Sequence, residues 1–574
     1  MRKVSPRLVA IMMAGAVTVT SITPVTGYQT ITVNAATDSQ EKEAAQGYQT
    51  NLTGFDYKKG DWKETKDGLY SNAVDKGDCF AFSKTTAKNF VYSTDVTFKR
   101  NQGAATLIFR FNNNLDNKEC YAVNIDGGSH KCKLWRWQEN SDYQLIDEKE
   151  VKATDDEKYT LKVVAYDSWI SYYVNDTLIA STGDYTLQKD DKGQSTVLTE
   201  GSLGLLNWNG EMTFQNTYYT ELNDQNTPEL KNISVSSSTG DVEKAAQFTS
   251  TEPIMIQYVK NNAETVDLNI EKKNENADVQ VEYDGKTYND GKNIPVKVGK
   301  NYITVKSTVQ GENGQTATLT YRVNVHRRAA DKTYYNEAYR NQYHYSVKDG
   351  WGNDLNGLVK YKGTYHMFYQ FYDDTKWGPM HWAHATSKDL IHWEEQPIAL
   401  YPDANGAMFS GCIVADEKNT SGLFGDGNEG GLVALITADG NGQRIKVAYS
   451  TDEGKTWKKT NKIVADWSKD PLNNRDFRDP KVFRWENKWF MVIAGGPLRI
   501  YSSDNLTDWK CESTYADLHT ECPDLYPIET KDGVKWVLSR GGRFYKVGDF
   551  KQVDGKWKFV ADEAYKNSDG VMNF

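Results

Sequence analysis

Three acidic side chains in the C-terminal part of the chain stand in unusual local sequence. They lie in the segments Trp351–Gly357 (WGNDLNG), Phe477–Pro480 (FRDP) and Glu521–Asp524 (ECPD), and the residues are Asp354, Asp479 and Glu521. Taken singly, each segment is weak evidence for a catalytic site. An Asp between Asn and Gly is ordinarily a turn residue, and an adjacent Arg-Asp can be a simple ion pair. Taken together, they offer the two carboxylates that glycosidic cleavage needs on opposite sides of the scissile bond.

In this order and spacing, the three segments resemble glycoside hydrolase family 32, the invertase, inulinase and levanase family. They match its W-x-N-D-P-N-G, R-D-P and E-C elements, and two further matching segments are Gly378–Asp389 (GPMHWAHATSKD) and Phe409–Gly411 (FSG). The sequence departs from the family pattern at Leu355, where Pro is usual, and at Cys412, where Ser is frequent.

The resemblance implies that a terminal fructosyl unit is cleaved with retention through a fructosyl-enzyme. Asp354 would be the nucleophile, Glu521 the general acid and base, and Asp479 would bind sugar hydroxyls in the transition state. Because Glu521 must be protonated to act as an acid, we expect burial and neighbouring carboxylates to raise its pKa. The same motif matching identifies the substrate-binding residues as Trp351, Asn353, Gln370, Trp377, Phe409, Ser410, Arg478 and Cys522.

A short repeat indicates the elements that must position these side chains. A Ser, an Asp two residues later and a Trp recur three times, at Ser387–Trp393, Ser450–Trp457 and Ser502–Trp509. The spacings of 63 and 52 residues suit four-stranded propeller blades with loops. The second copy (STDEGKTW) resembles the Asp-box turn, in which the Asp caps backbone N–H groups and the Trp packs between strands. For residues 340–574, the family resemblance implies a five-bladed β-propeller with a funnel-shaped axial pocket.

Two other β-rich regions precede this one, which makes the whole chain all-β. Residues 48–222 alternate as short strands, predict a lectin-like β-sandwich and resemble carbohydrate-binding module family 66, notably at Thr106–Asn112 (TLIFRFN). Candidate sugar-binding residues there are Arg110, Tyr121 and Trp135, each of which could equally be an ordinary strand residue. Residues 223–327 resemble immunoglobulin-like or cadherin-like sandwiches and are interpreted as a spacer.

The composition argues against several other classes of protein. The net charge is −10 and no basic run is present, which argues against nucleic acid as a partner. Six cysteines in 574 residues are too sparse for a disulfide scaffold, so the thiols are expected to be free and buried, although Cys120 and Cys132 could pair across neighbouring strands. No metal-ligand spacing occurs, and no metal or other cofactor is predicted.

The N-terminus predicts export. Arg2, Lys3 and Arg7 precede the apolar stretch Leu8–Val19, and small residues follow at Val33–Ala36, so residues 1–35 are interpreted as a signal peptide and residues 36–47 as a linker. The apolar stretch is shorter than the ~20 residues that span a bilayer, so no membrane span is predicted. We expect a secreted protein, either free or held at the cell surface through a region beyond residue 574.

The sequence therefore predicts a secreted β-fructosidase that hydrolyses levan, inulin or sucrose. The alternatives are a fructosyltransferase on the same propeller and a non-catalytic fructan-binding surface protein. A sialidase is disfavoured, because the three Arg that would grip a substrate carboxylate cannot be placed. About 224 residues follow the first propeller motif, whereas the repeat spacing implies about 290 for five blades. At most four blades fit, so we expect a fragment that is insoluble or nearly inactive by itself.

Overall fold

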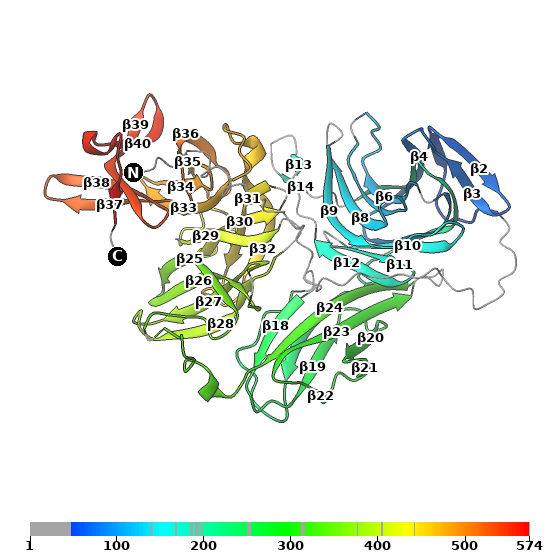
Figure 1. Cartoon of the computed structure of the whole chain (residues 1–574), viewed down its shortest axis with the longest axis horizontal. Coiled ribbons are helices and arrows are strands. Elements are labelled where there is room, and N and C mark those ends of the chain that lie inside the picture. The colour runs from blue at the N-terminus through cyan, green and yellow to red at the C-terminus, as the bar shows by residue number, and fades with distance from the viewer. Residues whose placement is uncertain are drawn as a thin grey trace, which may run out of the picture.

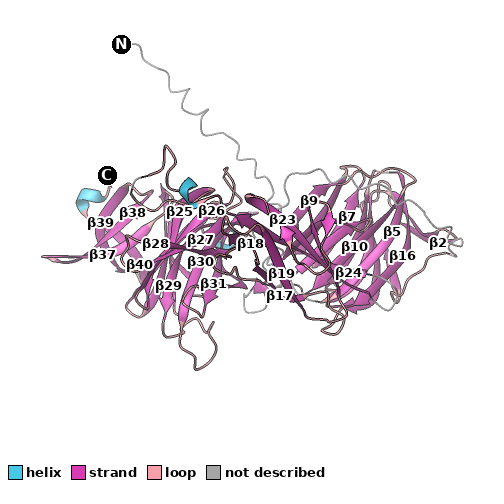
Figure 2. Ribbon diagram, turned by 90° about the horizontal axis from the view of Figure 1, so that it is seen from below, coloured by secondary structure: helices cyan, strands magenta, loops and turns pink. Residues whose placement is uncertain are grey.

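The structure is a computed structural model dominated by β-strands (Figures 1 and 2). It describes residues 47–100, 102–116, 118–138, 142–166, 169–183, 188–189, 195–196, 198, 200–249, 254–310, 316–341, 343–375, 377–402, 406–440 and 442–572, so the predicted signal peptide lies outside the described residues. Within these ranges the helices are three short 3-10 turns, η3 (Asp331–Thr333), η4 (Trp467–Lys469) and η5 (Glu563–Tyr565). No helix among the described residues is both long and apolar enough to cross a membrane.

The N-terminal sandwich consists of two seven-stranded sheets that pack face to face (blue to cyan in Figure 1). The first sheet has the order β1 (Phe55–Lys58), β4 (Asp78–Ala87), β15 (Gly201–Trp208), β6 (Ala104–Phe111), β7 (Cys120–Asp126), β8 (Lys131–Gln138) and β9 (Asp142–Glu150). The second has the order β12 (Thr177–Gly183), β11 (Trp169–Val174), β10 (Lys158–Tyr166), β5 (Phe90–Arg100), β16 (Glu211–Glu221), β3 (Gly68–Asn72) and β2 (Asp61–Thr65). A small hairpin, β13 (Gln188–Lys189) and β14 (Ser195–Thr196), stands apart from both.

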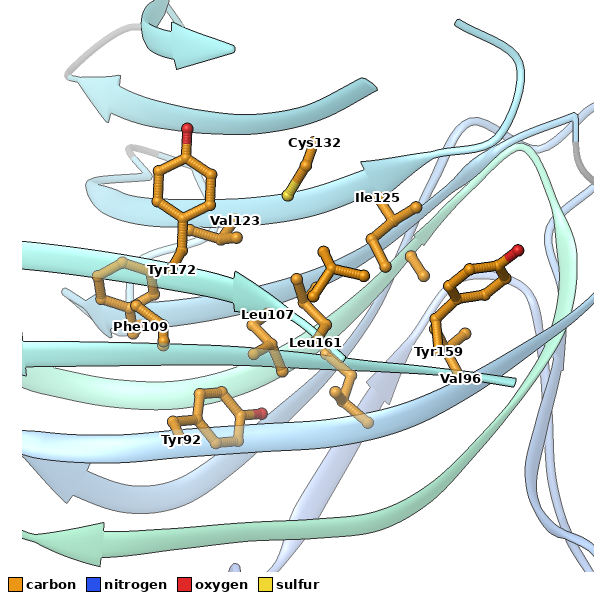
Figure 3. Packing of buried hydrophobic residues seen from close by; sticks show 14 of the residues in the cluster. Tyr92, Val96, Leu107, Phe109, Val123, Ile125, Cys132, Tyr159, Leu161 and Tyr172 are labelled. Carbon is orange, nitrogen blue, oxygen red and sulfur yellow. The ribbon is translucent and has the colours of Figure 1, made fainter. Parts of the chain in front are cut away.

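The core of this sandwich follows from the two-residue alternation of its strands. Leu107 and Phe109 of β6 point inward and pack with Tyr92 and Leu161 of the facing sheet (Figure 3). Successive strand residues face opposite sides, yet every residue of β6 is buried, because Ile108 and its neighbours contact a second apolar cluster on the outer side of the sheet. The strand is therefore mostly apolar on both faces, with Thr106 and Arg110 as its buried polar residues.

The middle sandwich, green in Figure 1, pairs a three-stranded sheet with a five-stranded one. The smaller has the order β17 (Leu230–Ser236), β19 (Thr265–Lys272) and β22 (Ile294–Pro295). The larger has the order β18 (Ile254–Val259), β24 (Thr316–Arg327), β23 (Gly299–Gln310), β20 (Asp278–Tyr283) and β21 (Lys286–Thr287). Its long strand β23 and the first part of β24 alternate between buried and partly exposed residues, as expected of a sheet with one face on the core, whereas residues 323–326 of β24 are all buried.

Four antiparallel sheets make up the third region, and each is a meander of consecutive strands. The first contains β25 (Trp351–Tyr361), β26 (Thr364–Tyr372), β27 (His381–Ser387) and β28 (Trp393–Leu400). The second contains β29 (Ala407–Asp416), β30 (Gly431–Gly440), β31 (Gly442–Ser450) and β32 (Lys458–Asp466). The third contains β33 (Arg478–Trp485), β34 (Lys488–Ala494), β35 (Pro497–Ser503) and β36 (Lys510–His519). The fourth contains β37 (Asp524–Thr530), β38 (Gly533–Arg540), β39 (Phe544–Val553) and β40 (Lys556–Ala561), with β41 (Gly570–Val571) paired to β39.

The first strands of these sheets contact one another in sequence, β25 with β29, β29 with β33, and β33 with β37. Meander sheets arranged around their first strands are built like propeller blades. The family resemblance implied five blades, and the described residues contain four such sheets. For the site, the important consequence is that the starts of four separate strands meet in one place.

The Ser–Asp–Trp repeat forms the turn between the third and fourth strands of the sheets. In the second sheet, Asp452 accepts hydrogen bonds from the Ser450 hydroxyl (2.8 Å) and the Thr456 N–H (2.9 Å), and Trp457 is buried. This is the structural turn that the sequence predicted. In the third sheet the register differs from the prediction, because Asn505, two residues after Ser503, occupies the capping position instead of Asp504. An amide oxygen accepts the same backbone hydrogen bonds as a carboxylate.

All six cysteines are free, as the sequence predicted, but they are not all buried. Cys120 and Cys132 are both buried without a disulfide between them, whereas Cys511 is partly exposed and Cys522 is exposed.

Candidate active site

The predicted site residues come from the beginnings of the first strands of the four sheets. Asp354 lies near the start of β25, Ser410 near the start of β29 and Asp479 at the start of β33. Glu521 and Cys522 come directly before β37. Because these strand starts are neighbours, residues as far apart in the sequence as Asp354 and Cys522 come into contact.

Each of the first three strands is bulged where its site residue stands. The pairing register shifts between Gly352 and Leu355 in β25, between Met408 and Gly411 in β29, and between Arg478 and Lys481 in β33. A bulge releases backbone from the ladder and re-aims side chains, which is a frequent feature next to active sites. These bulges turn polar residues toward the neighbouring sheets.

Asp354 is exposed and receives a hydrogen bond from the second sheet. The Ser410 hydroxyl donates to Asp354 Oδ2 at 2.8 Å, and Gln370 Nε2 donates to the Ser410 oxygen at 2.7 Å. Asn353 Nδ2 in turn donates to Gln370 Oε1 at 3.1 Å. Four predicted site residues therefore form one directed chain that ends on the carboxylate and fixes its orientation.

Asp479 is buried, with a φ of +61° that is uncommon outside glycine and is typical of strained functional positions. Its Oδ2 accepts the Cys522 N–H at 2.9 Å and lies 3.7 Å from Arg478 Nε. Burial raises the pKa of Asp479, and the Asp354 charge adds to this effect, while the Cys522 N–H and the Arg478 cation oppose it. The net direction is upward.

Cys522 joins the carboxylates of the first and third sheets. Its Sγ lies 3.7 Å from Asp354 Oδ2 and 3.6 Å from Asp479 Oδ2, so the two carboxylates lie on either side of one sulfur atom. Partial burial of the thiol and the charges of Asp479, Asp354 and Glu521 raise the pKa of Cys522 well above its usual range. The sulfur therefore stays a neutral thiol, whose single S–H can be shared between the carboxylates.

Glu521 is held by the third sheet but is not buried. Arg478 NH2 lies 3.4 Å from Glu521 Oε2, and the Glu521 side chain is 65% exposed. The burial expected around this residue is therefore wrong, because Glu521 lies on the loop between β36 and β37 with its carboxylate toward solvent and a cation. The backbone of this loop is fixed by the Gly541 N–H, which donates to the Glu521 carbonyl at 2.9 Å.

Aromatic side chains border the polar group. Trp377 is 52% exposed and packs edge to face on Phe409, with ring centroids 5.5 Å apart. Trp351 is also exposed, at the first position of β25. Position 411, directly after Phe409 and Ser410, is a glycine, because the Cβ of any other residue there would lie 2.1 Å from the Leu435 carbonyl oxygen. The small residue in the FSG segment thus permits close packing of strands, not approach of a ligand.

Sequence reasoning missed a second layer that links neighbouring sheets. Thr437 of β30 accepts the Asp479 N–H through its hydroxyl oxygen at 3.0 Å, and Gln443 of β31 accepts from Arg478 NH1 at 3.3 Å. Asn356 accepts the Gly411 N–H at 3.3 Å. Asn356 stands within the WGNDLNG motif and could have been identified, whereas Thr437 and Gln443 carry no local signal.

In the N-terminal sandwich, the three candidate sugar-binding residues do not form one site. Arg110 is fully buried and donates to the carbonyl oxygens of Lys88 and Leu198, at 2.9 and 3.0 Å. Tyr121 is fully buried in the core, stacked on Phe109. Only Trp135 is partly exposed, beside the outer apolar cluster. Arg110 and Tyr121 therefore present no surface to a ligand, and their prediction as sugar contacts is wrong.

Neighbouring carboxylates on an all-β scaffold, bordered by exposed tryptophan, are an arrangement suited to binding and cleaving a carbohydrate. The chain matches the family models described as "Glycosyl hydrolases family 32 N-terminal domain" over residues 344–570, "Cadherin-like beta sandwich domain" over residues 230–328 and "3-keto-alpha-glucoside-1,2-lyase-like domain" over residues 47–219. Residues 344–570 are thus similar to the N-terminal domain of glycoside hydrolase family 32.

Two curated relatives carry related names. The chain is 67% identical over 517 residues to a "Fructan beta-fructosidase" of Streptococcus mutans serotype c, which covers 90% of this chain and 36% of the relative. It is 45% identical over 249 residues to a "Levanase" of Bacillus subtilis, which covers 39% of this chain and 36% of the relative. The chain thus spans about a third of the length of both relatives.

Solved structures are similar to separate parts of the chain. Carbohydrate-binding module CBM66 of Bacillus subtilis is 26% identical with a TM-score of 0.26, covering 30% of this chain and 98% of the module. A fructofuranosidase of Schwanniomyces occidentalis complexed with fructose is 35% identical with a TM-score of 0.36, covering 40% of this chain and 49% of that one.

Proposed function

We propose that the protein is a secreted β-fructosidase that hydrolyses fructans with retention. The observation that carries the proposal is the cluster itself. Asp354, Asp479 and Glu521 come from three strand starts, and their polar contacts with Ser410, Cys522 and Arg478 join them into one group. Two relatives named as a fructan β-fructosidase and a levanase favour fructose polymers as substrates.

Asp354 is the nucleophile of the proposed mechanism. Its carboxylate is exposed to an incoming sugar while the Ser410 hydrogen bond fixes one of its oxygens. Attack on the anomeric carbon of a terminal fructosyl unit forms the covalent intermediate and breaks the bond to the leaving oxygen. An oriented carboxylate lowers the entropic part of this barrier, since little reorganisation remains.

Glu521 is the proposed acid and base. In the first step it donates a proton to the leaving oxygen, and in the second it takes a proton from the water that attacks the fructosyl-enzyme. Arg478 stands 3.4 Å from Glu521 Oε2 and 3.7 Å from Asp479 Oδ2, so it orients the Glu521 carboxyl group relative to the buried Asp479.

Asp479 binds the sugar and does not react covalently in this scheme. Its carboxylate is buried beside Arg478 and the Cys522 N–H, so it is rigid before substrate arrives. Hydrogen bonds from ring hydroxyls to a fixed carboxylate strengthen as positive charge develops on the flattening ring. Asp479 thus stabilises the transition state more than the ground state.

The N-terminal sandwich is proposed to bind fructan and to raise the local concentration of substrate. Trp135 lies on the outer face of the first sheet beside a cluster that includes Phe80, Phe82 and Trp137. Secretion is proposed from the N-terminal sequence pattern in residues 1–35.

The test of the proposal is the product profile on levan, inulin and sucrose. We expect free fructose from a fructan, and none after Asp354→Asn, which removes the nucleophile with little change in volume. A fructosyltransferase would instead lengthen an acceptor, and a non-catalytic binding protein would retain fructan without releasing fructose. Near wild-type turnover by Asp354→Asn would contradict the mechanism.

A further inference from the structure

The middle sandwich shares an apolar core with the first sheet of the catalytic region. Ile256 and Tyr258 of β18 pack with Met367 and Tyr369 of β26 and with Ile398 of β28. The contact is a buried cluster between the two domains, so β18, the edge strand of the five-stranded sheet, is fixed against one face of the first sheet (Figure 1).

The loop between β26 and β27 leaves the first sheet at the same end as Asp354. The register pairs Trp351 with Tyr372 and Phe371 with His381, so the end of β26 and the start of β27 lie beside the start of β25. Trp377 is carried on this loop and contacts Phe409, which precedes Ser410, the donor to Asp354. The position of the loop therefore sets one wall of the site.

Two side chains of the middle sandwich hold the beginning of this loop. His326 Nε2 lies 3.1 Å from Asp373 Oδ2, and Lys300 Nζ lies 3.7 Å from Asp373 Oδ1 and 4.0 Å from Asp374 Oδ1. Lys300 and His326 are cross-strand partners on β23 and β24, so they act on Asp373 from one rigid surface. His326 is buried, and Asp373 is mostly buried.

The electrostatics agree with this geometry. Burial by itself would raise the pKa of Asp373, yet the His326 and Lys300 side chains beside its carboxylate outweigh this effect, and the net shift is downward. Asp373 is thus a buried carboxylate stabilised from the neighbouring domain. Such an anchor costs more to break than an exposed ion pair, because the carboxylate would remain desolvated without its partner.

We propose that Lys300 and His326 are positioning residues of the active site, which fix the Trp377 loop through Asp373. The inference rests on the proposed function, and it extends the site into a domain that the sequence had identified as a spacer. Neither residue touches the reacting atoms. Their effect is to hold the aromatic wall where a fructosyl unit is bound.

The experiment compares two interdomain variants of the intact protein. His326→Ala should raise KM for fructan about tenfold and leave kcat within about twofold, since the 3.1 Å contact with the mostly buried Asp373 carboxylate is lost away from the reacting atoms. His326→Gln, whose amide can still donate to Asp373, should restore most of the affinity. The matched control is Gln247→Ala. Gln247 also belongs to the middle sandwich and makes two hydrogen bonds to the Trp457 backbone, at 2.9 and 3.1 Å, but Trp457 lies at the end of the second sheet opposite the site.

A substrate-free readout keeps the inference separate from the proposed function. Hydroxyl-radical footprinting of Trp377 should show a changed oxidation rate in His326→Ala and an unchanged rate in Gln247→Ala. Wild-type KM and footprint in His326→Ala would overturn the inference, as would an equal change in both variants. A wild-type protein that releases no fructose would refute the proposed function, while the footprint would still decide whether His326 anchors the loop.

Discussion

Removing the Ser410 hydroxyl tests whether the hydrogen-bonded chain that ends on Asp354 matters for catalysis. In Ser410→Ala, Asp354 loses a 2.8 Å hydrogen bond, and Gln370 loses the acceptor that it reaches at 2.7 Å. A hydrogen bond to an ionised group contributes about 1.5–3 kcal/mol. Since about 1.4 kcal/mol corresponds to a tenfold rate change, kcat/KM should fall about 10- to 150-fold.

The assay is fructose release from a fructan at substrate concentrations well below KM, which reports kcat/KM directly. Ser502→Ala is a matched control, because the Ser502 hydroxyl also donates to a carboxylate, Glu512 Oε1, at 2.8 Å, and Ser502 is buried in the third sheet away from the site. The control should keep wild-type kcat/KM. If Ser410→Ala stays within twofold of wild type, or if both variants decline together, the Ser410 hydrogen bond has no special role in catalysis.

Four further outcomes are expected. Glu521→Gln should lower the turnover rate on fructan by several orders of magnitude, but much less on a substrate with an activated leaving group, which needs no proton. Turnover of the two substrates, measured side by side, decides this. Because burial raises the pKa of Asp479, its ionised form destabilises the fold. Asp479→Asn should therefore have a higher Tm than wild type at neutral pH. The difference in Tm should disappear as the pH falls toward the ordinary pKa of an Asp side chain, and a difference that does not depend on pH would contradict this. Arg328→Ala leaves Glu243, Asp349 and Glu395 without their shared cation. It should lower the free energy of unfolding, measured by urea denaturation, by about 3–5 kcal/mol. Retention requires the Asp354 and Glu521 carboxyl groups to lie about 5–5.5 Å apart in the substrate complex. NMR of the first fructose released should show the same anomeric configuration as the substrate, and the opposite configuration would indicate inversion.

The sequence predicted the strands and turns of this protein, and the residues of its candidate site, from local signals. The alternation of residues in the first two regions predicted strands, and the Ser–Asp–Trp repeat predicted the turns that recur from sheet to sheet. Asp354, Asp479 and Glu521 were identified by their motifs, and the structure brings the starts of their strands together around Cys522 and Arg478. These features are readable because a motif or a turn is a property of a few consecutive residues.

Contacts between distant residues could not be read in the same way. Gln370 was identified by motif matching, but its link to Ser410 depends on a bulge that turns Ser410 toward the first sheet. Arg110 and Tyr121 have the residue types of a sugar site, yet both are buried. For Arg110 the reason is a local one, since its φ of +54° coincides with an irregularity in the pairing of β6 with β15, and its guanidinium donates to backbone carbonyls.

The bulges explain why the site stands where it does. A strand start that gives up ladder hydrogen bonds leaves backbone groups that must find other partners. Here the Asp479 N–H binds Thr437 of the second sheet, and the Gly411 N–H binds Asn356 of the first. The lost ladder bonds are thus replaced by bonds between sheets, and the polar side chains that make these bonds converge on the space between the first strands. The same feature that interrupts each strand therefore joins neighbouring sheets and gathers the carboxylates, so loss of one bulge should disturb stability and catalysis together.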